Sequence, residues 1–127
     1  MRAMTVTVAV VLTLVLAIGI FCGLHSRNTS ESYKVRIEEV AAAIRQEKWE
    51  EALRLIREAE QDWEDESGTL AMWVNHEDVD EVSVGMAQLR VSLEENERYH
   101  ALLYAAELEE ALTLIYQRDA FSLKNIL

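Results

Sequence analysis

The amino-acid sequence predicts an all-α protein in which one N-terminal transmembrane helix precedes a small antiparallel helical bundle of two helical hairpins. Three observations support this fold class. Residues 4–24 form an apolar run without a charged side chain, apolar residues then recur at helical spacing, and the 127 residues contain no proline. No segment alternates apolar and polar residues with a period of two, so we expect no β-sheet.

The apolar run at residues 4–24 is long enough to cross a bilayer. At about 1.5 Å per residue, a helix of this length spans roughly 31 Å, the thickness of the hydrocarbon core. A cleavable signal has a shorter apolar stretch and a small-x-small site, and the end of this run offers no such site. We therefore predict a transmembrane signal-anchor over residues 1–24, a linker over 25–29 and an acidic all-helical domain over 30–127.

Cleavage near Cys22 is the alternative, and it would release a secreted or lipidated soluble protein. Bulky Phe21 directly before this cysteine differs from the small residue that lipid-attachment signals carry there. The short leader with Arg2 is the usual layout of an exporting signal-anchor. We therefore expect a single-pass protein of the cell membrane whose soluble domain is extracytoplasmic. The positive-inside rule alone favours the opposite orientation, because basic residues follow the run at Arg27, Lys34 and Arg36.

The first helical hairpin is predicted over residues 30–66. Asn28 and Glu31 have the spacing of a capping box and predict a helix start at Asn28. The chain turns near residues 46–48, and a second helix begins at Trp49. Ser67 and Gly68 end this helix, with the glycine in the left-handed conformation.

The join of these two helices resembles that of a tetratricopeptide repeat. An aromatic residue starts the second helix and a small alanine permits close approach, but Glu47 or Lys48 replaces the usual glycine. No second copy follows 34 residues later, which excludes a repeat array. An antiparallel helical pair remains as the interpretation.

A second hairpin follows a short helical piece over residues 69–74, which is halted by Asn75 and His76. Asp78 is expected to cap the next helix, and a turn at Asn96 and Glu97 separates it from a last helix. The third helix carries apolar residues at alternating spacings of three and four, a seam made for packing on another helix: Val79, Val82, Met86, Leu89 and Leu93. The last helix carries a similar stripe of Leu102 or Leu103, Leu108, Leu112 and Ile115.

The charge of the domain limits its partners. The net charge is −11 and every acidic residue lies at or beyond Glu31, so phosphate backbones are repelled and we expect no nucleic-acid partner. Anionic headgroups are repelled as well, so the domain should stand off the membrane. The three tryptophans, Trp49, Trp63 and Trp73, are expected to anchor the core.

The sequence contains no convincing catalytic or metal-binding signature. His76 and Asp80 share a helical face, with Asp78 between them, but no second histidine follows and no calcium-loop spacing is present. An acidic helix start explains these residues. We expect no enzyme, no metal and no cofactor, and we keep a metal-dependent enzyme using these three residues as an alternative.

The C-terminal tail is the candidate partner-binding element. Its apolar residues either fold back to close the bundle or dock on a partner, as short apolar segments do in grooves. The residues are Phe121, Leu123, Ile126 and Leu127.

The stretch from Trp73 to Asp80 (WVNHEDVD) and the closing FSLKNIL resemble a family catalogued as domain of unknown function 4363. The resemblance implies a small single-pass protein with an amino-terminal anchor and a helical remainder, found mainly in spore-forming Gram-positive bacteria. It implies no activity, cofactor or catalytic residue. Together these observations predict a membrane-anchored helical interaction or accessory module with a protein partner, such as a multi-pass membrane protein.

Overall fold

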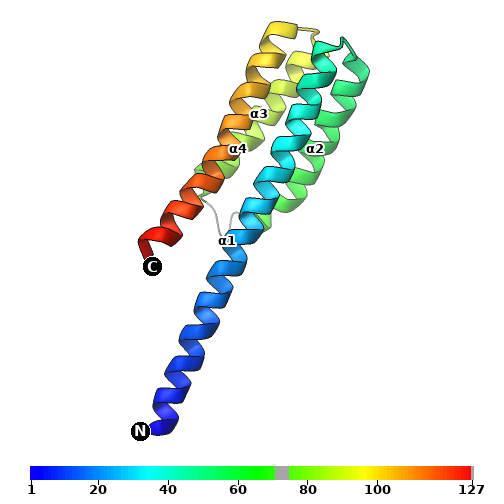
Figure 1. Cartoon of the computed structure of the whole chain (residues 1–127). Helices are drawn as coiled ribbons and strands as arrows, with labels where there is room; N and C mark the ends of the chain where they lie inside the picture. The colour runs from blue at the N-terminus through cyan, green and yellow to red at the C-terminus, as the bar shows by residue number, and fades with distance from the viewer. Residues whose placement is uncertain (71–74, 127) are drawn as a thin grey trace.

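The computed structural model of the chain describes residues 1–70 and 75–126 (Figure 1). Within several helical stretches only the backbone is described, namely residues 22–23, 25–28, 70, 116 and 118–126. The described residues form four helices and no strand: α1 Arg2–Arg45, α2 Trp49–Leu70, α3 His76–Glu94 and α4 Arg98–Ile126. The predicted all-α fold, with an apolar N-terminal helix ahead of a helical bundle, is confirmed.

The four helices run alternately up and down and close into a ring, because α1 packs on both α2 and α4 and α3 completes the other two contacts. Their inward faces build one apolar core. The seam predicted on the third helix is confirmed as part of it, since Val79, Val82, Met86, Leu89 and Leu93 are all buried. Trp63 is buried too, Trp49 packs at the edge of the core, and Trp73 lies outside the described residues.

Helix α1 is longer than the sequence analysis predicted. It continues without interruption from Arg2 to Arg45, through the expected linker at residues 25–29. The predicted helix start at Asn28 is therefore wrong. A capping residue begins a helix only where the chain before it leaves the helical conformation, and here residues 2–27 are helical and contain no proline that would end the helix. The apolar segment and the first bundle helix are one rod.

Two further predicted boundaries are wrong. Gly68 lies inside α2, which continues to Leu70, and no described glycine has a positive φ. Asn75, and not Asp78, caps α3, because its side-chain oxygen accepts a hydrogen bond from the backbone N–H of Glu77 at 3.1 Å. Asp78 lies buried in the first turn of α3 instead.

The two hairpin turns have the same geometry. Each contains one residue in the left-handed region, Glu47 with φ 60° and Asn96 with φ 56°. In each, the N–H of the next residue bonds back across the turn, from Lys48 to Ala43 and from Glu97 to Ser92, both at 2.9 Å. The predicted turns at 46–48 and at 96–97 are confirmed.

The burial pattern also repeats with an interval of 49 residues. Buried positions of the first hairpin recur as buried positions of the second, in the pairs Tyr33 and Val82, Ile37 and Met86, Val40 and Leu89, Ile44 and Leu93, Ala52 and Ala101, Ala59 and Leu108, and Trp63 and Leu112. The bundle is thus built from two similar hairpins. The 34-residue interval tested in the sequence was too short to find this repeat.

Candidate functional site

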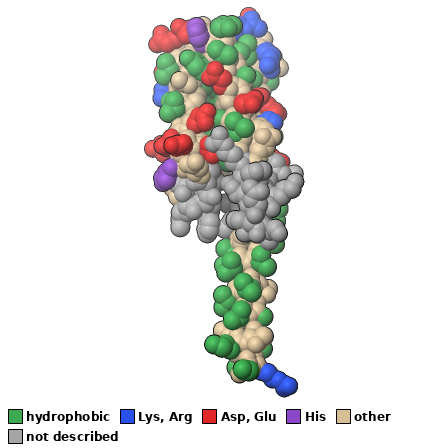
Figure 2. Space-filling view, turned by 90° about the vertical axis from the view of Figure 1, so that its left-hand side faces the viewer, with side chains coloured by type: hydrophobic (Ala, Val, Ile, Leu, Met, Phe, Trp, Pro, Cys, Tyr) green, Lys and Arg blue, Asp and Glu red, His purple; other side chains and the backbone are tan. Residues whose placement is uncertain are grey.

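The apolar first half of α1 projects from the bundle (Figure 1). Residues Arg2–Phe21 of α1 are long and apolar enough to cross a membrane, and they are the one such stretch among the described residues. None of them is buried in the protein. Figure 2 shows hydrophobic side chains along this segment and a basic side chain at its tip; Arg2 is the one charged residue of Arg2–Phe21. Such a helix is consistent with a membrane anchor and also with a signal sequence.

The hydroxyl groups of three threonines in this segment are hydrogen-bonded to the backbone of the same helix. The hydroxyls of Thr5, Thr7 and Thr13 donate to carbonyl oxygens one turn earlier, at 3.1, 2.8 and 2.8 Å. A hydroxyl bonded within its own helix leaves no unpaired donor for the surrounding hydrocarbon. The polar residues of the run are therefore compatible with a lipid environment.

An aromatic cluster of Tyr33 and Trp63 lies at the level of the first buried turns of α1. The rings of Tyr33 and Trp63 are nearly perpendicular, with centroids 5.1 Å apart, and the Trp63 indole N–H donates to the Ser83 hydroxyl oxygen at 2.9 Å. The Ser83 hydroxyl in turn donates to the Val79 carbonyl at 3.1 Å. Burial, with Glu66 nearby, raises the pKa of Tyr33, so this phenol stays neutral at physiological pH. The cluster ties α1, α2 and α3 together at the level of the first buried turns of α1.

Ion pairs connect the outer surfaces of the helices. Arg90 of α3 donates to Glu60 of α2 at 2.8 Å and to Glu94 on its own helix at 3.0 Å. Arg36 of α1 pairs with Asp62 of α2 at 2.9 Å. These groups are partly exposed, so each pair adds little stability, about 0–1 kcal/mol; the pairs join α1 to α2 and α2 to α3.

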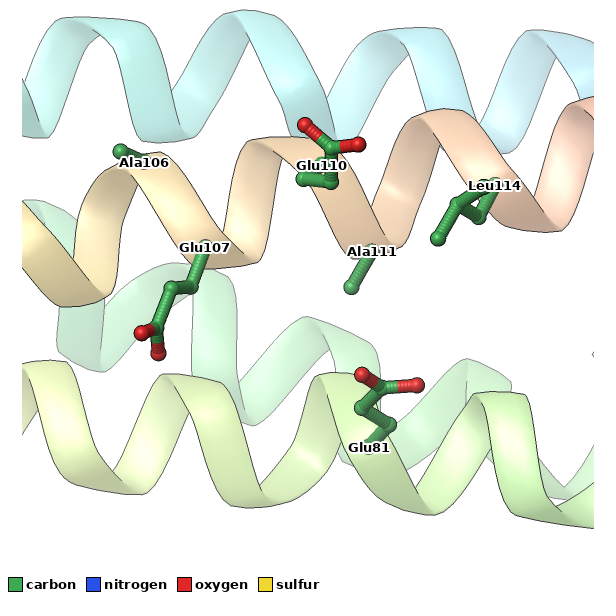
Figure 3. A pocket seen from close by; sticks show the side chains of 6 residues that line it. All are labelled: Glu81, Ala106, Glu107, Glu110, Ala111 and Leu114. Atoms are coloured by element: carbon green, nitrogen blue, oxygen red, sulfur yellow. The ribbon is translucent and has the colours of Figure 1, made fainter.

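A shallow groove between α3 and α4 is lined by carboxylates. Glu81 of α3 and Glu107 of α4 point toward the space between the two helices, whereas Glu110 points away from α3 (Figure 3). Ala106, Ala111 and Leu114 form the apolar part of the lining. This groove was not predicted from the sequence. The spacing of Glu107, Glu110 and Leu114 along one helix was the available signal, but it does not reveal which residue of α3 lies opposite.

One carboxylate lies at the contact between α4 and α1. Burial raises the pKa of Glu109, and the nearby Glu38 of α1 raises it further. Lys34 and Arg45 act in the opposite direction and do not cancel the effect. Glu109 therefore has a higher pKa than a free glutamate and holds its proton more tightly.

The three residues weighed as metal ligands lie at the start of α3. His76 and Asp80 are exposed, whereas Asp78 is buried. Over residues 1–70 and 75–126, no group of three or more histidine, cysteine or acidic side chains is arranged to hold a metal ion. The described residues at this helix start provide a cap and an acidic first turn, as the helix dipole favours.

Three of the tail residues, Phe121, Leu123 and Ile126, lie on the last turns of α4. The helix continues to Ile126, so the backbone of Phe121, Leu123 and Ile126 extends the bundle helix and does not fold back on it. Leu127 and the side chains of the other three residues lie outside the described part of the chain. Their assignment as partner-binding residues stays a prediction.

The comparisons with known proteins give one family. A family model described as Domain of unknown function (DUF4363) matches residues 24–126. Because this range covers most of the chain, the chain belongs to that family, and the resemblance seen in the sequence is confirmed. No curated protein and no solved structure matches the chain.

Proposed function

We propose that this member of the DUF4363 family is a single-pass, membrane-anchored accessory protein that holds an acidic helical bundle beside a membrane-protein partner. The partner we propose is a multi-pass membrane protein, because such a protein can contact both the anchor and a domain close to the bilayer. The proposal includes no enzymatic role, no cofactor and no nucleic-acid ligand. It places the bundle outside the cytoplasm.

The continuity of α1 is the observation that supports this proposal best. The apolar segment Arg2–Phe21 and the buried residues from Ser30 to Ile44 belong to one helix of 44 residues. A flexible linker would let the bundle move far from the membrane, whereas an unbroken helix holds it at a fixed height and angle. A fixed position is useful for a protein whose task is to contact a neighbour in the same membrane.

The mass of the mature chain distinguishes this proposal from a secreted or lipidated protein. An uncleaved anchor leaves the mass of the full sequence, 14.5 kDa. Cleavage near Cys22 would remove the apolar segment and would also divide α1 in its middle. A mature chain that begins near residue 22 would contradict the anchor.

The orientation is tested with single cysteines in a Cys22→Ser background. Lys48→Cys lies in the exposed turn between α1 and α2, at the end of the bundle away from the apolar segment, and Ala3→Cys lies at the other end of α1 and leaves Arg2 in place. We expect a membrane-impermeant maleimide to label Lys48→Cys on intact cells and Ala3→Cys only after lysis. The reverse pattern would place the bundle in the cytoplasm.

The partner is tested by native gel electrophoresis of membranes solubilised in a mild detergent. We expect the chain to migrate in a complex that contains a second protein, and replacing residues 4–24 by an unrelated apolar helix to leave part of this complex intact through the bundle. A complex containing only copies of this chain would contradict an accessory role.

A further inference from the structure

The carboxyl-terminal turns of α4 extend beyond the rest of the bundle, toward the apolar segment of α1. All four helices share one end, where the turns at residues 46–48 and 95–97 lie and where Arg98 of α4 contacts Glu47 at 3.6 Å. From this shared end α2 has 22 residues, α3 has 19 and α4 has 29. At 1.5 Å per residue, α4 reaches about 10 Å further than α2 and about 15 Å further than α3.

The register of α4 against α1 shows how far this extension reaches. The two helices are antiparallel neighbours: Arg98 contacts Glu47, in the turn after α1, at 3.6 Å, and nearer the middle Glu109 lies close enough to Glu38 for the two like charges to repel. Ile126 lies about 42 Å along α4 from Arg98, and Phe21 lies about 36 Å along α1 from Arg45. The last turn of α4 therefore comes level with the end of the candidate membrane span. Figure 1 shows the carboxyl end of α4 below the ends of α2 and α3, partway down α1.

The residues in this extension suit the boundary between lipid and water. The segment after Asp119 contains Phe121, Leu123 and Ile126 together with one lysine and no acidic residue. It differs in this from the bundle, which carries the acidic charge of the chain. An apolar and basic helix end is attracted to anionic headgroups and buries its apolar side chains at the acyl boundary, while a lysine can extend to the surface.

We infer that the carboxyl-terminal turns of α4, residues 120–126, are a second membrane contact that lies in the bilayer interface beside the anchor. This inference rests on the membrane placement under Proposed function. The bundle is then held to the bilayer at two points, by α1 through the span and by α4 at the surface. The two contacts restrict the tilt of α1 in the bilayer, which a single span leaves free. The acidic groove between α3 and α4 is thereby held at one inclination to the membrane.

The experiment uses the full chain in the Cys22→Ser background, reconstituted into phosphatidylethanolamine and phosphatidylglycerol vesicles. A single environment-sensitive NBD label is attached at Phe121→Cys or at Leu123→Cys. These positions lie about 200° apart around a helix, so the two labels do not both point into the bundle. Val11→Cys in the span and Leu103→Cys on the exposed part of α4 are the matched controls. Quenching by spin-labelled lipid is compared with quenching by aqueous iodide.

We expect Val11→Cys and at least one tail position to be quenched several-fold more by spin-labelled lipid than Leu103→Cys, and iodide to show the reverse order. Tail labels quenched like Leu103→Cys, with Val11→Cys still in lipid, would overturn the second contact and leave the anchor intact. A Val11→Cys label open to iodide would overturn the anchor itself. If iodide quenches the tail labels in these vesicles but not in native membranes, the tail contacts a protein partner and not lipid, and the inference is overturned.

Discussion

Glu47 and Asn96 occupy equivalent left-handed positions in the two hairpin turns, with φ 60° and 56°, although they are 49 residues apart. The left-handed conformation at the end of a helix is natural for glycine, acceptable for asparagine and unfavourable for glutamate. The two turns therefore have one geometry but different intrinsic stabilities. The sequence showed that the first turn lacks the glycine usual there, but it did not show whether Glu47 or Lys48 takes the left-handed position.

Glu47→Gly is expected to stabilise the bundle by about 0.5–1 kcal/mol. The substitution removes the cost of a left-handed glutamate, about 1–2 kcal/mol, and the added freedom of glycine in the unfolded chain offsets part of the gain. The ion pair between Glu47 and Arg98 is exposed, so its removal costs little. Urea unfolding of the full chain in detergent, followed by far-UV circular dichroism, measures the change.

Asn96→Gly and Gln46→Gly are the controls for this prediction. Asn96→Gly should gain less, because asparagine already tolerates the left-handed region. Gln46 has φ −86°, so a glycine there brings no relief and should destabilise. Equal effects at residues 46 and 47 would show that backbone strain does not decide the stability of this turn.

The two glycines in α2 and α3, Gly68 and Gly85, are expected to respond in opposite directions to alanine. A Cβ at Gly68 would have no atom within 4 Å, so Gly68→Ala should gain up to about 1 kcal/mol of helix stability. A Cβ at Gly85 would lie 3.0 Å from Leu108 Cδ1, in the tightly packed contact of α3 with α4. Overpacking costs about 1–3 kcal/mol and the helix preference of alanine offsets about 1 kcal/mol of this, so Gly85→Ala should destabilise by about 1 kcal/mol.

The Leu108→Val background tests the cause of the Gly85 effect. The shorter side chain removes the Cδ1 atom that the new methyl group would meet, so Gly85→Ala should become neutral or stabilising there. Thermal unfolding of the four variants in this cycle gives the coupling energy. An unchanged penalty in the Leu108→Val chain would assign the cost to the backbone of α3.

The hydrogen bond between Trp63 and Ser83 is expected to contribute measurably to stability. Trp63 is buried, with 2% of its surface exposed, so removal of its acceptor leaves an indole N–H without a partner. Ser83→Ala should therefore cost about 1–3 kcal/mol. In a Trp63→Phe chain, where the donor is absent, the same substitution should cost less, with a coupling of about 1 kcal/mol. Additive losses would mean that the bond contributes nothing beyond packing.

The regular part of the fold was predictable because its signals are local. Apolar spacing located the seam from Val79 to Leu93, and the polar residues around Asn96 located the turn. The length and apolar character of residues 4–24 identified the candidate span. Each of these signals is contained within a few turns of one helix.

Other features depend on contacts between distant segments, which one sequence does not show. Asn28 and Glu31 have capping chemistry, but they lie within α1 because the apolar helix before them continues. The groove needs Glu81 of α3 and Glu107 of α4 to lie along the same space between the two helices, and the extension of α4 depends on the relative lengths of all four helices. Helix packing sets these relationships, so spacing along one helix could not predict them.

Glu109 is expected to make the stability of the bundle depend on pH. Its pKa in the folded protein is raised above the ordinary 4.5 by burial and by Glu38, so the folded state binds its proton more tightly than the unfolded state. Stability therefore falls as the pH rises from about 4.5 through the raised pKa, and the loss is complete above it.

Glu109→Gln removes this dependence of stability on pH. The variant should match the parent near pH 4 and exceed it at pH 7 by a few tenths of a kcal/mol to about 1 kcal/mol. Urea midpoints measured across this range test the difference, with Glu110→Gln, an exposed neighbour of the same charge, as the control. An equal gain at pH 7 in both variants would show that the overall negative charge, and not the contact with α1, opposes folding.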